Sequence, residues 1–309
     1  MKSRLASIDI GTNTIRLLIA DTDKKSKLHK VLTERRIARL GEDFIEKSEI
    51  SFKAIERSIV ILKEFINITK KYNVRKVITG ATSAVRKAEN KDEFLKKVYK
   101  ETGLQVRVLS EREEATITFT GVLTVMDSVM GKTLVMDIGG GSTEFIIGEG
   151  NVPVSTYSLD LGAVHLTERF IRSDPPSLQE LDKTREFIDK RLFSFKESVI
   201  NSQSGISFSS LIGTAGTITT LASMDQQMTV YDPERINKYL ITRESITNIY
   251  TMLCGLTLAE RSALPGLEKG REDIIMTGTV IVLEVMKAFQ FHEMMVSDHG
   301  LLEGLLKLS

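Results

Sequence analysis

The chain has 309 residues, of which 41% are hydrophobic and 27% are charged. These values are ordinary for globular proteins and argue against disordered and fibrous classes, while the length suits two domains. With 42 basic and 41 acidic residues the formal net charge is +1, so overall charge gives no pull toward nucleic acid or a membrane.

The first part of the chain predicts a mixed sheet covered by helices. Three short strands come first, in an antiparallel meander, at residues 5–10, 15–20 and 28–34. Helical periodicity and capping signals then alternate with apolar runs. Ser51 and Ser110 are predicted N-caps, and Glu113 completes a capping box with Ser110. The expected elements are a helix at 51–71, a strand at 74–80, a helix at 84–102 ended by Gly103, a strand at 106–109 and a helix at 111–125.

The same order of strand, turn, strand, strand begins again at residue 133, with strands at 133–138, 143–148 and 152–158. We interpret this recurrence as an internal duplication. It predicts domain I at 1–122, completed by a C-terminal helix at 300–309, and domain II at 123–299. The remaining predicted elements are a helix at 174–199, a strand at 208–212, helices at 242–254, 258–263 and 271–289, a strand at 294–297 and a helix at 301–308 that crosses back to domain I.

Two turns in matching places of this duplication share one chemistry. In each, an apolar strand ends in an aspartate, and a glycine and small polar residues follow. Successive backbone N–H groups in such turns form an anion-binding nest, and the carboxylate beside it suits a magnesium ion that a phosphate shares. A single copy could be an ordinary hairpin, but two copies favour a phosphate chain held from both sides, in a cleft between the domains. The strand-end carboxylates Asp9 and Asp137 are therefore candidate metal ligands, and the turn residues that follow them are candidate phosphate ligands.

A third motif, Gly213-Thr214-Ala215-Gly216-Thr217, lies between an apolar strand and an apolar helix. Gly213 and Thr214 are candidate phosphate ligands there, because a helix N-terminus attracts anions. The alternative is a glycine-rich turn with a threonine cap. The motif is not a P-loop, since no Gly-Lys-Ser/Thr follows.

Two charged residues are candidates for catalysis. Glu114 stands in a run of acids that helix capping explains only in part, so it is a candidate general base for a water that attacks phosphorus. Arg86 lies where a helix begins, a poor place for a cation unless an anion is near. The alternative for Arg86 is a solvated surface cation.

Other features exclude some classes of site. One cysteine, Cys254, cannot form an internal disulfide, and its apolar setting favours a buried structural role. The four histidines lack metal-ligand spacing, which argues against zinc. The N-terminus lacks the apolar run of a signal peptide, and no segment reaches the length that spans a bilayer. We therefore expect a cytoplasmic protein without membrane or nucleic-acid partners.

With these motifs placed, the chain resembles the exopolyphosphatase and guanosine pentaphosphate phosphohydrolase (Ppx/GppA) family nearly end to end, in its short, two-domain form. The resemblance is carried by six segments besides the 213–217 motif, which are 7–14, 81–86, 113–115, 137–144, 161–164 and 297–301. It implies an α/β fold with two duplicated actin-like ATPase and ribonuclease H-like domains around a central cleft. One departure is Leu302, where the family usually has arginine.

The resemblance also implies the chemistry. The family's catalytic glutamate matches Glu114, its phosphate-contacting arginine matches Arg86, and its metal-side acids match Asp137 and Glu144. The phosphate ligands that the resemblance implies are Thr12, Asn13, Gly139, Gly140, Gly141, Ser142 and Thr143. It implies a phosphoric anhydride hydrolase that needs Mg²⁺, with Mn²⁺ or an added monovalent cation as alternatives. The substrate would be polyphosphate or guanosine pentaphosphate, between which the residues do not choose. A homodimer that extends the substrate channel is a hypothesis.

Two other functions remain open from the residues. A sugar or acetate kinase of the same superfold would need an acceptor base near the second turn and an adenine pocket near residues 213–217. A non-enzymatic actin-like nucleotide-binding protein would assemble with nucleotide and show negligible turnover. The additional acids at Glu113 and Glu114 favour hydrolysis over both.

Overall fold

The computed structural model describes residues 3–23, 27–42, 48–126, 131–202 and 207–308. The prediction that the N-terminus lacks a signal peptide rests in part on Met1 and Lys2, and these two residues lie outside the described residues. The chain divides into two compact units. Unit 1 comprises Met1–Thr124 and His299–Ser309, and unit 2 comprises Val125–Asp298.

Unit 1 is built on a five-stranded mixed sheet with the order β3-β2-β1-β4-β5. β1 pairs antiparallel with β2 and parallel with β4, so the predicted meander opening a mixed sheet is confirmed. Because β1, β4 and β5 run parallel, their carboxyl ends meet at one edge of the sheet, where parallel strands place binding sites. The strands are β1 (Ser3–Ile10), β2 (Thr14–Thr22), β3 (Leu28–Ile37), β4 (Lys76–Ala81) and β5 (Val106–Val108).

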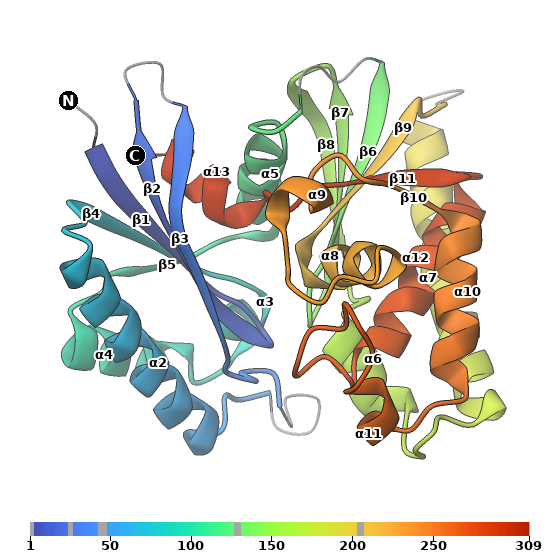
Figure 1. The fold of residues 1–309 in the computed structure, drawn as a ribbon, viewed down its shortest axis with the longest axis horizontal. Helices are drawn as coiled ribbons and strands as arrows, with labels where there is room; N and C mark the ends of the chain where they lie inside the picture. Colours follow the sequence, from blue (N-terminus) through green and yellow to red (C-terminus); the bar gives the residue numbers. More distant parts are fainter. Residues whose placement is uncertain (1–2, 24–26, 43–47, 127–130, 203–206, 309) are drawn as a thin grey trace. The chain divides into compact units, whose positions relative to one another are not determined.

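Helices cover both faces of this sheet (Figure 1). On one face, Ile55, Ile59 and Phe65 of α2 pack with the sheet and with α4 in the largest apolar cluster of the unit. On the other face, α5 and α13 cover Leu5, Ile78 and their neighbours. The helices are α2 (Phe52–Lys71), α3 (Ser83–Lys87), α4 (Lys91–Thr102), α5 (Glu111–Val122) and α13 (Leu301–Lys307).

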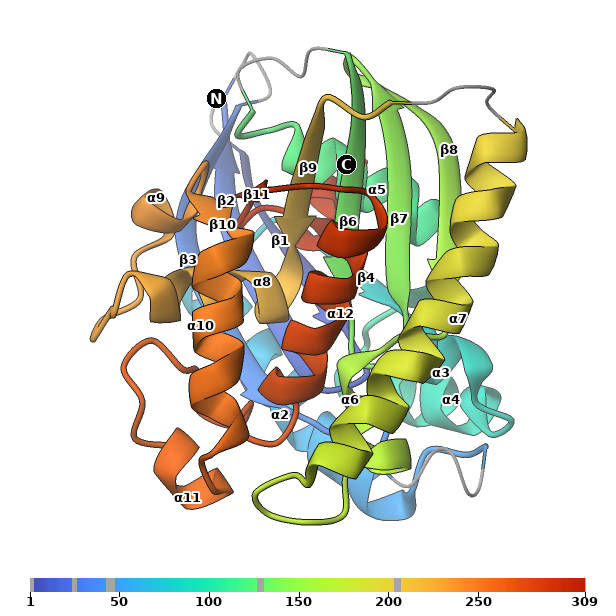
Figure 2. The same cartoon turned by 90° about the vertical axis from the view of Figure 1, so that its right-hand side faces the viewer.

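Unit 2 has a six-stranded mixed sheet with the order β10-β11-β9-β6-β7-β8. Figure 2 shows α7, α12 and α10 side by side across one face of it, with α12 in the middle. The strands are β6 (Lys132–Ile138), β7 (Thr143–Glu149), β8 (Val152–Leu159), β9 (Ser210–Thr214), β10 (Leu240–Thr242) and β11 (Glu293–Val296). The helices are α6 (Ala163–Phe170), α7 (Leu178–Ser202), α8 (Ala215–Asp225), α9 (Pro233–Ile236), α10 (Arg243–Cys254), α11 (Leu258–Arg261) and α12 (Ile275–Ala288).

The two units repeat one pattern, as the internal duplication predicts. In each, a first strand forms an antiparallel hairpin with the second, which pairs with a third, while the first strand's other side pairs parallel with a later strand. The hairpins even close at the same register, with Ile10 opposite Ile15 and Ile138 opposite Thr143. The predicted turns therefore occupy equivalent places in the two sheets.

Three predictions about elements are wrong, and three short elements were missed. The helix predicted at 84–102 is interrupted, because the Asn90 side chain bonds the backbone N–H and carbonyl of Ile50 and so holds the chain out of helix. The strand predicted at 208–212 instead spans Ser210–Thr214, and α8 begins directly at Ala215. The helix predicted from 271 begins at Ile275, after a turn at 272–274. The short elements α6, α9 and β10 were not predicted at all.

Three further observations concern Leu302, Cys254 and the apolar character of the described helices. Leu302 packs with Leu5, Leu18 and Leu306, so this position belongs to the core of unit 1. Cys254 is partly buried against the core of unit 2. Across the part of the chain that the structure describes, no helix has both the length and the apolar character needed to cross a membrane.

Candidate active site

Loop 1 (residues 11–14) joins β1 to β2 at the sheet edge of unit 1. Gly11 N–H bonds the Thr14 carbonyl at 3.0 Å, which closes the turn. The carbonyl of Asn13 accepts from the amides of Ala38 and Arg39, and that of Thr12 accepts from Gly41. These two carbonyl oxygens are therefore already bonded within unit 1. The backbone amides of loop 1 are the groups that can bind an anion. Asn13 also has a buried side-chain nitrogen, Nδ2, with no hydrogen-bond partner in the structure.

Asp9 lies directly opposite Arg16 in the β1–β2 hairpin. The Arg16 guanidinium donates to Asp9 Oδ2 from Nη2 at 2.7 Å and from Nε at 3.0 Å. Asp9 is 4% exposed, and its second oxygen, Oδ1, is buried without a partner. One oxygen is therefore neutralised by arginine, and the other remains for a cation or a water. Arg16 was missed in the sequence analysis, although strand pairing across a tight turn places it opposite Asp9.

Arg86 and Glu114 meet at the same sheet edge. α3 follows β4 and carries Arg86, while α5 follows β5 and carries Glu114 in its first turn. Arg86 Nη1 donates to Glu114 Oε2 at 2.6 Å, and Glu114 is 7% exposed. Arg86 Nε and Nη2 are buried and have no hydrogen-bond partner in the structure. Buried guanidinium nitrogens normally find acceptors, so this side chain is suited to an oxyanion.

The first turn of α5 is fixed by its capping box. Ser110 Oγ accepts from Glu113 N–H, and the Glu113 carboxylate accepts from Ser110 N–H at 2.9 Å. The Glu113 carboxylate also accepts from Ser110 Oγ at 2.7 Å, and its two bonds from Ser110, together with Arg107, lower the pKa of Glu113 to about 2. Glu113 is therefore occupied with holding the helix start, which leaves Glu114 as the acid of this turn that is buried beside Arg86.

Loop 2 (residues 139–142) is the equivalent turn of unit 2. Gly139 N–H bonds the Ser142 carbonyl at 2.9 Å, as in loop 1. The carbonyls of Gly139 and Gly140 accept from the first amides of α6, at residues 163–165. A Cβ added at Gly162 would lie 2.2 Å from the Gly140 carbonyl oxygen, so this approach requires glycine. Helix α6, which was not predicted, thus bonds the carbonyl oxygens of loop 2. The backbone amides of loop 2 remain to bind an anion.

Two carboxylates lie beside loop 2 where loop 1 has an ion pair. Asp137 is opposite Glu144 in the β6–β7 hairpin, at the register that Asp9 and Arg16 occupy in unit 1. Glu144 Oε1 accepts from Ser142 Oγ at 2.7 Å and from Ser158 Oγ at 3.1 Å. Both acids are at most 9% exposed. Thr143 uses its hydroxyl within the fold, donating to the Leu161 carbonyl.

The third motif adjoins the second. β6 and β9 are parallel, and Thr214 pairs with Asp137, so Gly213 and Thr214 reach the same sheet edge as loop 2. The N-terminus of α8 follows, with Ala215 in the left-handed region at φ 71°. A Cβ added at Gly216 would lie 1.7 Å from Arg271 Nη2, so the guanidinium lies against the start of α8. Arg271, also missed from sequence, ion-pairs with Glu268 at 2.6 Å.

The candidate metal ligands are divided between the units. Among the described residues, no group of three or more His, Cys, Asp or Glu side chains is arranged to hold a metal ion. Asp137 and Glu144 form a pair in unit 2, and Asp9 belongs to unit 1. Such a sparse set of carboxylates fits magnesium, which usually keeps several waters and shares phosphate oxygens.

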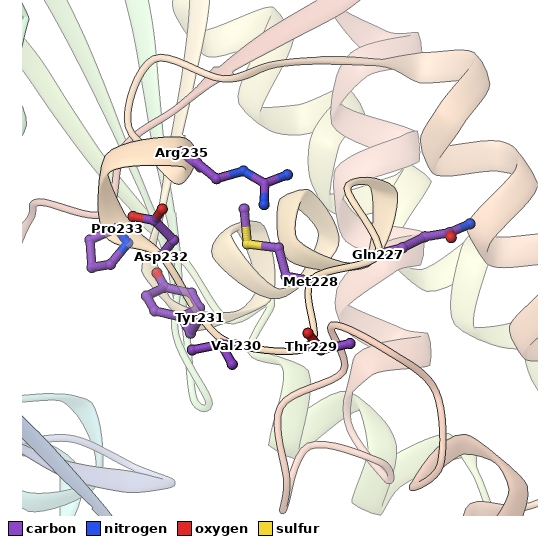
Figure 3. A pocket seen from close by; sticks show the side chains of 8 residues that line it. All are labelled: Gln227, Met228, Thr229, Val230, Tyr231, Asp232, Pro233 and Arg235. Carbon is purple, nitrogen blue, oxygen red and sulfur yellow. The ribbon is translucent and has the colours of Figure 1, made fainter.

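A separate pocket of about 460 Å³ lies in unit 2, at the segment that joins α8 to α9 (Figure 3). In Figure 3 the Met228 side chain points toward Arg235, whereas Gln227 points away. The lining residues are Gln227, Met228, Thr229, Val230, Tyr231, Asp232, Pro233 and Arg235. None of the residues predicted to bind phosphate or metal lines it, so this pocket is not the candidate active site.

Comparison with known proteins agrees with the family resemblance of the sequence. The model of the Ppx/GppA phosphatase family matches residues 18–308. Exopolyphosphatase 2 of Mycobacterium tuberculosis is 34% identical, with 98% of this chain and 97% of the relative covered. A bifunctional 3-dehydroquinate synthase/phosphatase of Fusobacterium nucleatum is 35% identical over 97% of this chain and 45% of that protein.

Solved structures agree. An exopolyphosphatase from Cytophaga hutchinsonii is 32% identical with a TM-score of 0.90, covering 99% of this chain and 97% of that one. An Aquifex aeolicus member of the Ppx/GppA family is 34% identical with a TM-score of 0.81, also over 99% and 97% of the two chains. The predicted actin-like fold class and the predicted class of enzyme, a phosphoric anhydride hydrolase, are confirmed. This chain belongs to the Ppx/GppA phosphatase family.

Proposed function

We propose that this protein is an exopolyphosphatase that releases the terminal phosphate of inorganic polyphosphate by in-line attack of water. The observation that carries the proposal is the buried Arg86–Glu114 pair at the sheet edge of unit 1, next to loop 1. In this pair, the Glu114 carboxylate can accept a proton, and the Arg86 guanidinium has two nitrogens without a hydrogen-bond partner. Hydrolysis of a phosphoric anhydride needs both a base and a positive charge for the phosphoryl oxygens.

In the proposed mechanism, Glu114 orients the attacking water and accepts its proton. Arg86 keeps Glu114 in place through Nη1, and Nε and Nη2 bind oxygens of the transferred phosphoryl group. The amides of loops 1 and 2 bind phosphate, and Gly213 and Thr214 contribute at the start of α8. Most of the rate would come from positioning and from electrostatic stabilisation of the transferring group.

We propose Mg²⁺ as the cofactor, with Asp137 and Glu144 as its candidate ligands in unit 2 and Asp9 Oδ1 as a candidate ligand in unit 1. Asp9 fits in part, because Oδ1 is a buried carboxylate oxygen without a partner, whereas Oδ2 is neutralised by Arg16. When bound, the ion would neutralise phosphate charge beside loop 2. Mn²⁺ is the alternative ion, and the homodimer stays a prediction that sedimentation analysis would test.

Phosphate release by the purified protein tests this function. We would compare long-chain polyphosphate, guanosine pentaphosphate and ATP with Mg²⁺ and with EDTA, and use Glu114→Gln as the matched control. We expect release from polyphosphate that EDTA and Glu114→Gln abolish. Release from guanosine pentaphosphate alone would change the substrate and keep the mechanism. Phosphate transfer from ATP to a small acceptor would favour the kinase, and tight nucleotide binding without turnover would favour a nucleotide-binding protein.

A further inference from the structure

The two units carry opposite charge, which the net charge of the whole chain conceals. Unit 1 has 27 lysines and arginines against 18 acids, a formal charge of +9, and unit 2 has 15 against 23, a formal charge of −8. A polyanionic chain is attracted to the positive unit and repelled by the negative one. The part of a long substrate that extends beyond the reacting phosphate should therefore follow unit 1.

Arg39 is a cation of unit 1 whose backbone is hydrogen-bonded to loop 1. Its N–H donates to the Asn13 carbonyl at 2.8 Å, beside the N–H of Ala38 at 2.9 Å. Ala38 and Leu40 are fully buried, whereas Arg39 between them is exposed. The backbone is therefore fixed against the loop, while the arginine between these two buried residues is exposed.

Arg39 has a backbone conformation that arginine rarely adopts. Its φ is 47°, in the left-handed region where glycine and asparagine are the usual residues. Arg57 also stabilises this conformation, because it donates to the carbonyls of Ala38 and Arg39. Arg57 itself is ion-paired with Glu42 at 3.0 Å, so its role is to hold this segment. Residues kept in such strained positions cluster at functional sites.

We propose that Arg39 binds phosphate groups of the chain beyond the one held by loop 1, and so gives the enzyme a preference for long substrates. This inference rests on the proposed function and adds a specificity residue to it. A guanidinium binds phosphate oxygens in pairs, which suits a repeating chain of phosphates. Arg39 and Arg86 have different roles: Arg86 is buried beside the proposed base, whereas Arg39 is exposed next to loop 1.

The test is Arg39→Asn, because asparagine accepts the left-handed backbone and removes only the cation. We expect KM for long-chain polyphosphate to rise roughly 10- to 100-fold, as for loss of a charge-assisted contact. The value of kcat should stay within about threefold, and KM for tripolyphosphate should change far less. The dependence of log KM on log salt concentration should also become shallower, since one phosphate contact is lost.

Lys238→Asn is the matched control. Lys238 is an exposed cation at φ 65°, in unit 2, where asparagine also fits the backbone. The same change there should leave KM for both substrates as in the wild type. Thermal unfolding of both variants would show that any kinetic change does not come from loss of fold.

Two results would overturn the proposal. One is an equal loss on long and short substrates, which would place Arg39 with the catalytic residues, and the other is no change at all. Failure of the proposed function is distinguishable, because then the wild-type protein releases phosphate from no substrate. Calorimetric binding of long-chain polyphosphate to Glu114→Gln, with and without Arg39→Asn, still tests Arg39 in that case, and equal affinities would reject it.

Discussion

Arg86 uses one guanidinium nitrogen, Nη1, to bond both Glu114 Oε2 at 2.6 Å and the carbonyl oxygen of Leu109 at 2.8 Å. This shared donor connects α3 to the end of β5 and to the first turn of α5. The two other guanidinium nitrogens are buried without partners. A single side chain thus positions the proposed base and presents two donor nitrogens that no described residue satisfies.

The Arg86–Glu114 pair should couple measurably in stability. The side chains are 15% and 9% exposed, so their attraction is little screened, and loss of either partner leaves the other charge poorly compensated. For Arg86→Gln, Glu114→Gln and the double variant, we expect a coupling free energy of about 1–3 kcal/mol in urea unfolding. Additive effects would show that the contact contributes nothing to the fold.

Arg86→Lys should separate charge from geometry in catalysis. Lysine keeps a cation but has a single nitrogen, which cannot bond Leu109, Glu114 and a phosphoryl group in the same arrangement. We expect kcat for polyphosphate to fall roughly 100- to 1,000-fold with a smaller change in KM, as for loss of a transition-state contact. Lys87→Arg, the reverse exchange at the next residue, is the control and should retain turnover.

Ser158 should tune the metal affinity of Glu144. Its hydroxyl donates to Glu144 Oε1 from the neighbouring strand, and such bonds orient a metal ligand. In Ser158→Ala we expect the affinity for Mn²⁺, measured by calorimetry without substrate, to fall roughly tenfold. Ser155→Ala removes a hydroxyl from the same strand away from Glu144 and should bind as the wild type does. Equal binding by both variants would speak against a role for Ser158.

Local signals in the sequence were sufficient for most of what positions the site. Ser51 and Ser110 cap α2 and α5 as predicted, because an N-cap side chain bonds residues only two or three positions ahead. The two aspartate–glycine turns are also local, since a glycine and strand alternation specify them. Hence the turns and the helix that carries Glu114 could be placed before any tertiary contact was known.

What escaped prediction depends on partners far along the chain. The break between α3 and α4 comes from Asn90 bonding Ile50, and the contact of Arg271 with Gly216 joins segments that are still farther apart in the chain. The short helix α6 is stabilised by giving its first amides to loop 2 rather than by its own sequence. Propensity and periodicity carry no information about such contacts.

Acid should weaken the start of α5 through Glu113. Its folded-state pKa, about 2, lies below the ordinary glutamate value because Ser110 and Arg107 bind the ionised form. A carboxyl group whose pKa is lower in the folded state stabilises the fold at pH values above its unfolded pKa, near 4.5. This stabilisation is lost as the pH falls toward 2. The stability difference between wild type and Glu113→Gln should therefore shrink between pH 5 and about pH 2 in urea unfolding. Glu111→Gln, in the same turn but outside the capping box, is the matched control.

The packing of α5 on α13 depends on glycine. A Cβ added at Gly121 would lie 1.8 Å from the Gly300 carbonyl oxygen, and one added at Gly304 would lie 1.9 Å from that of Ile117. Both obstacles are backbone atoms, which cannot move aside as a flexible side chain can. The helix that carries Glu114 is therefore held at close range against the C-terminal helix of the same unit.

Gly121→Ala should consequently destabilise the protein and disturb catalysis together. We expect a loss of about 1–3 kcal/mol in urea unfolding, as for overpacking in a core, and a lower kcat because the start of α5 carries Glu114. Gly255→Ala is the matched control: Gly255 caps α10 with an ordinary negative φ, and an added Cβ meets nothing within 4 Å. That variant should be neutral or slightly stabilised, since alanine restricts the unfolded chain more than glycine does. If the two variants unfold at the same urea concentration, close packing of α5 on α13 does not limit stability.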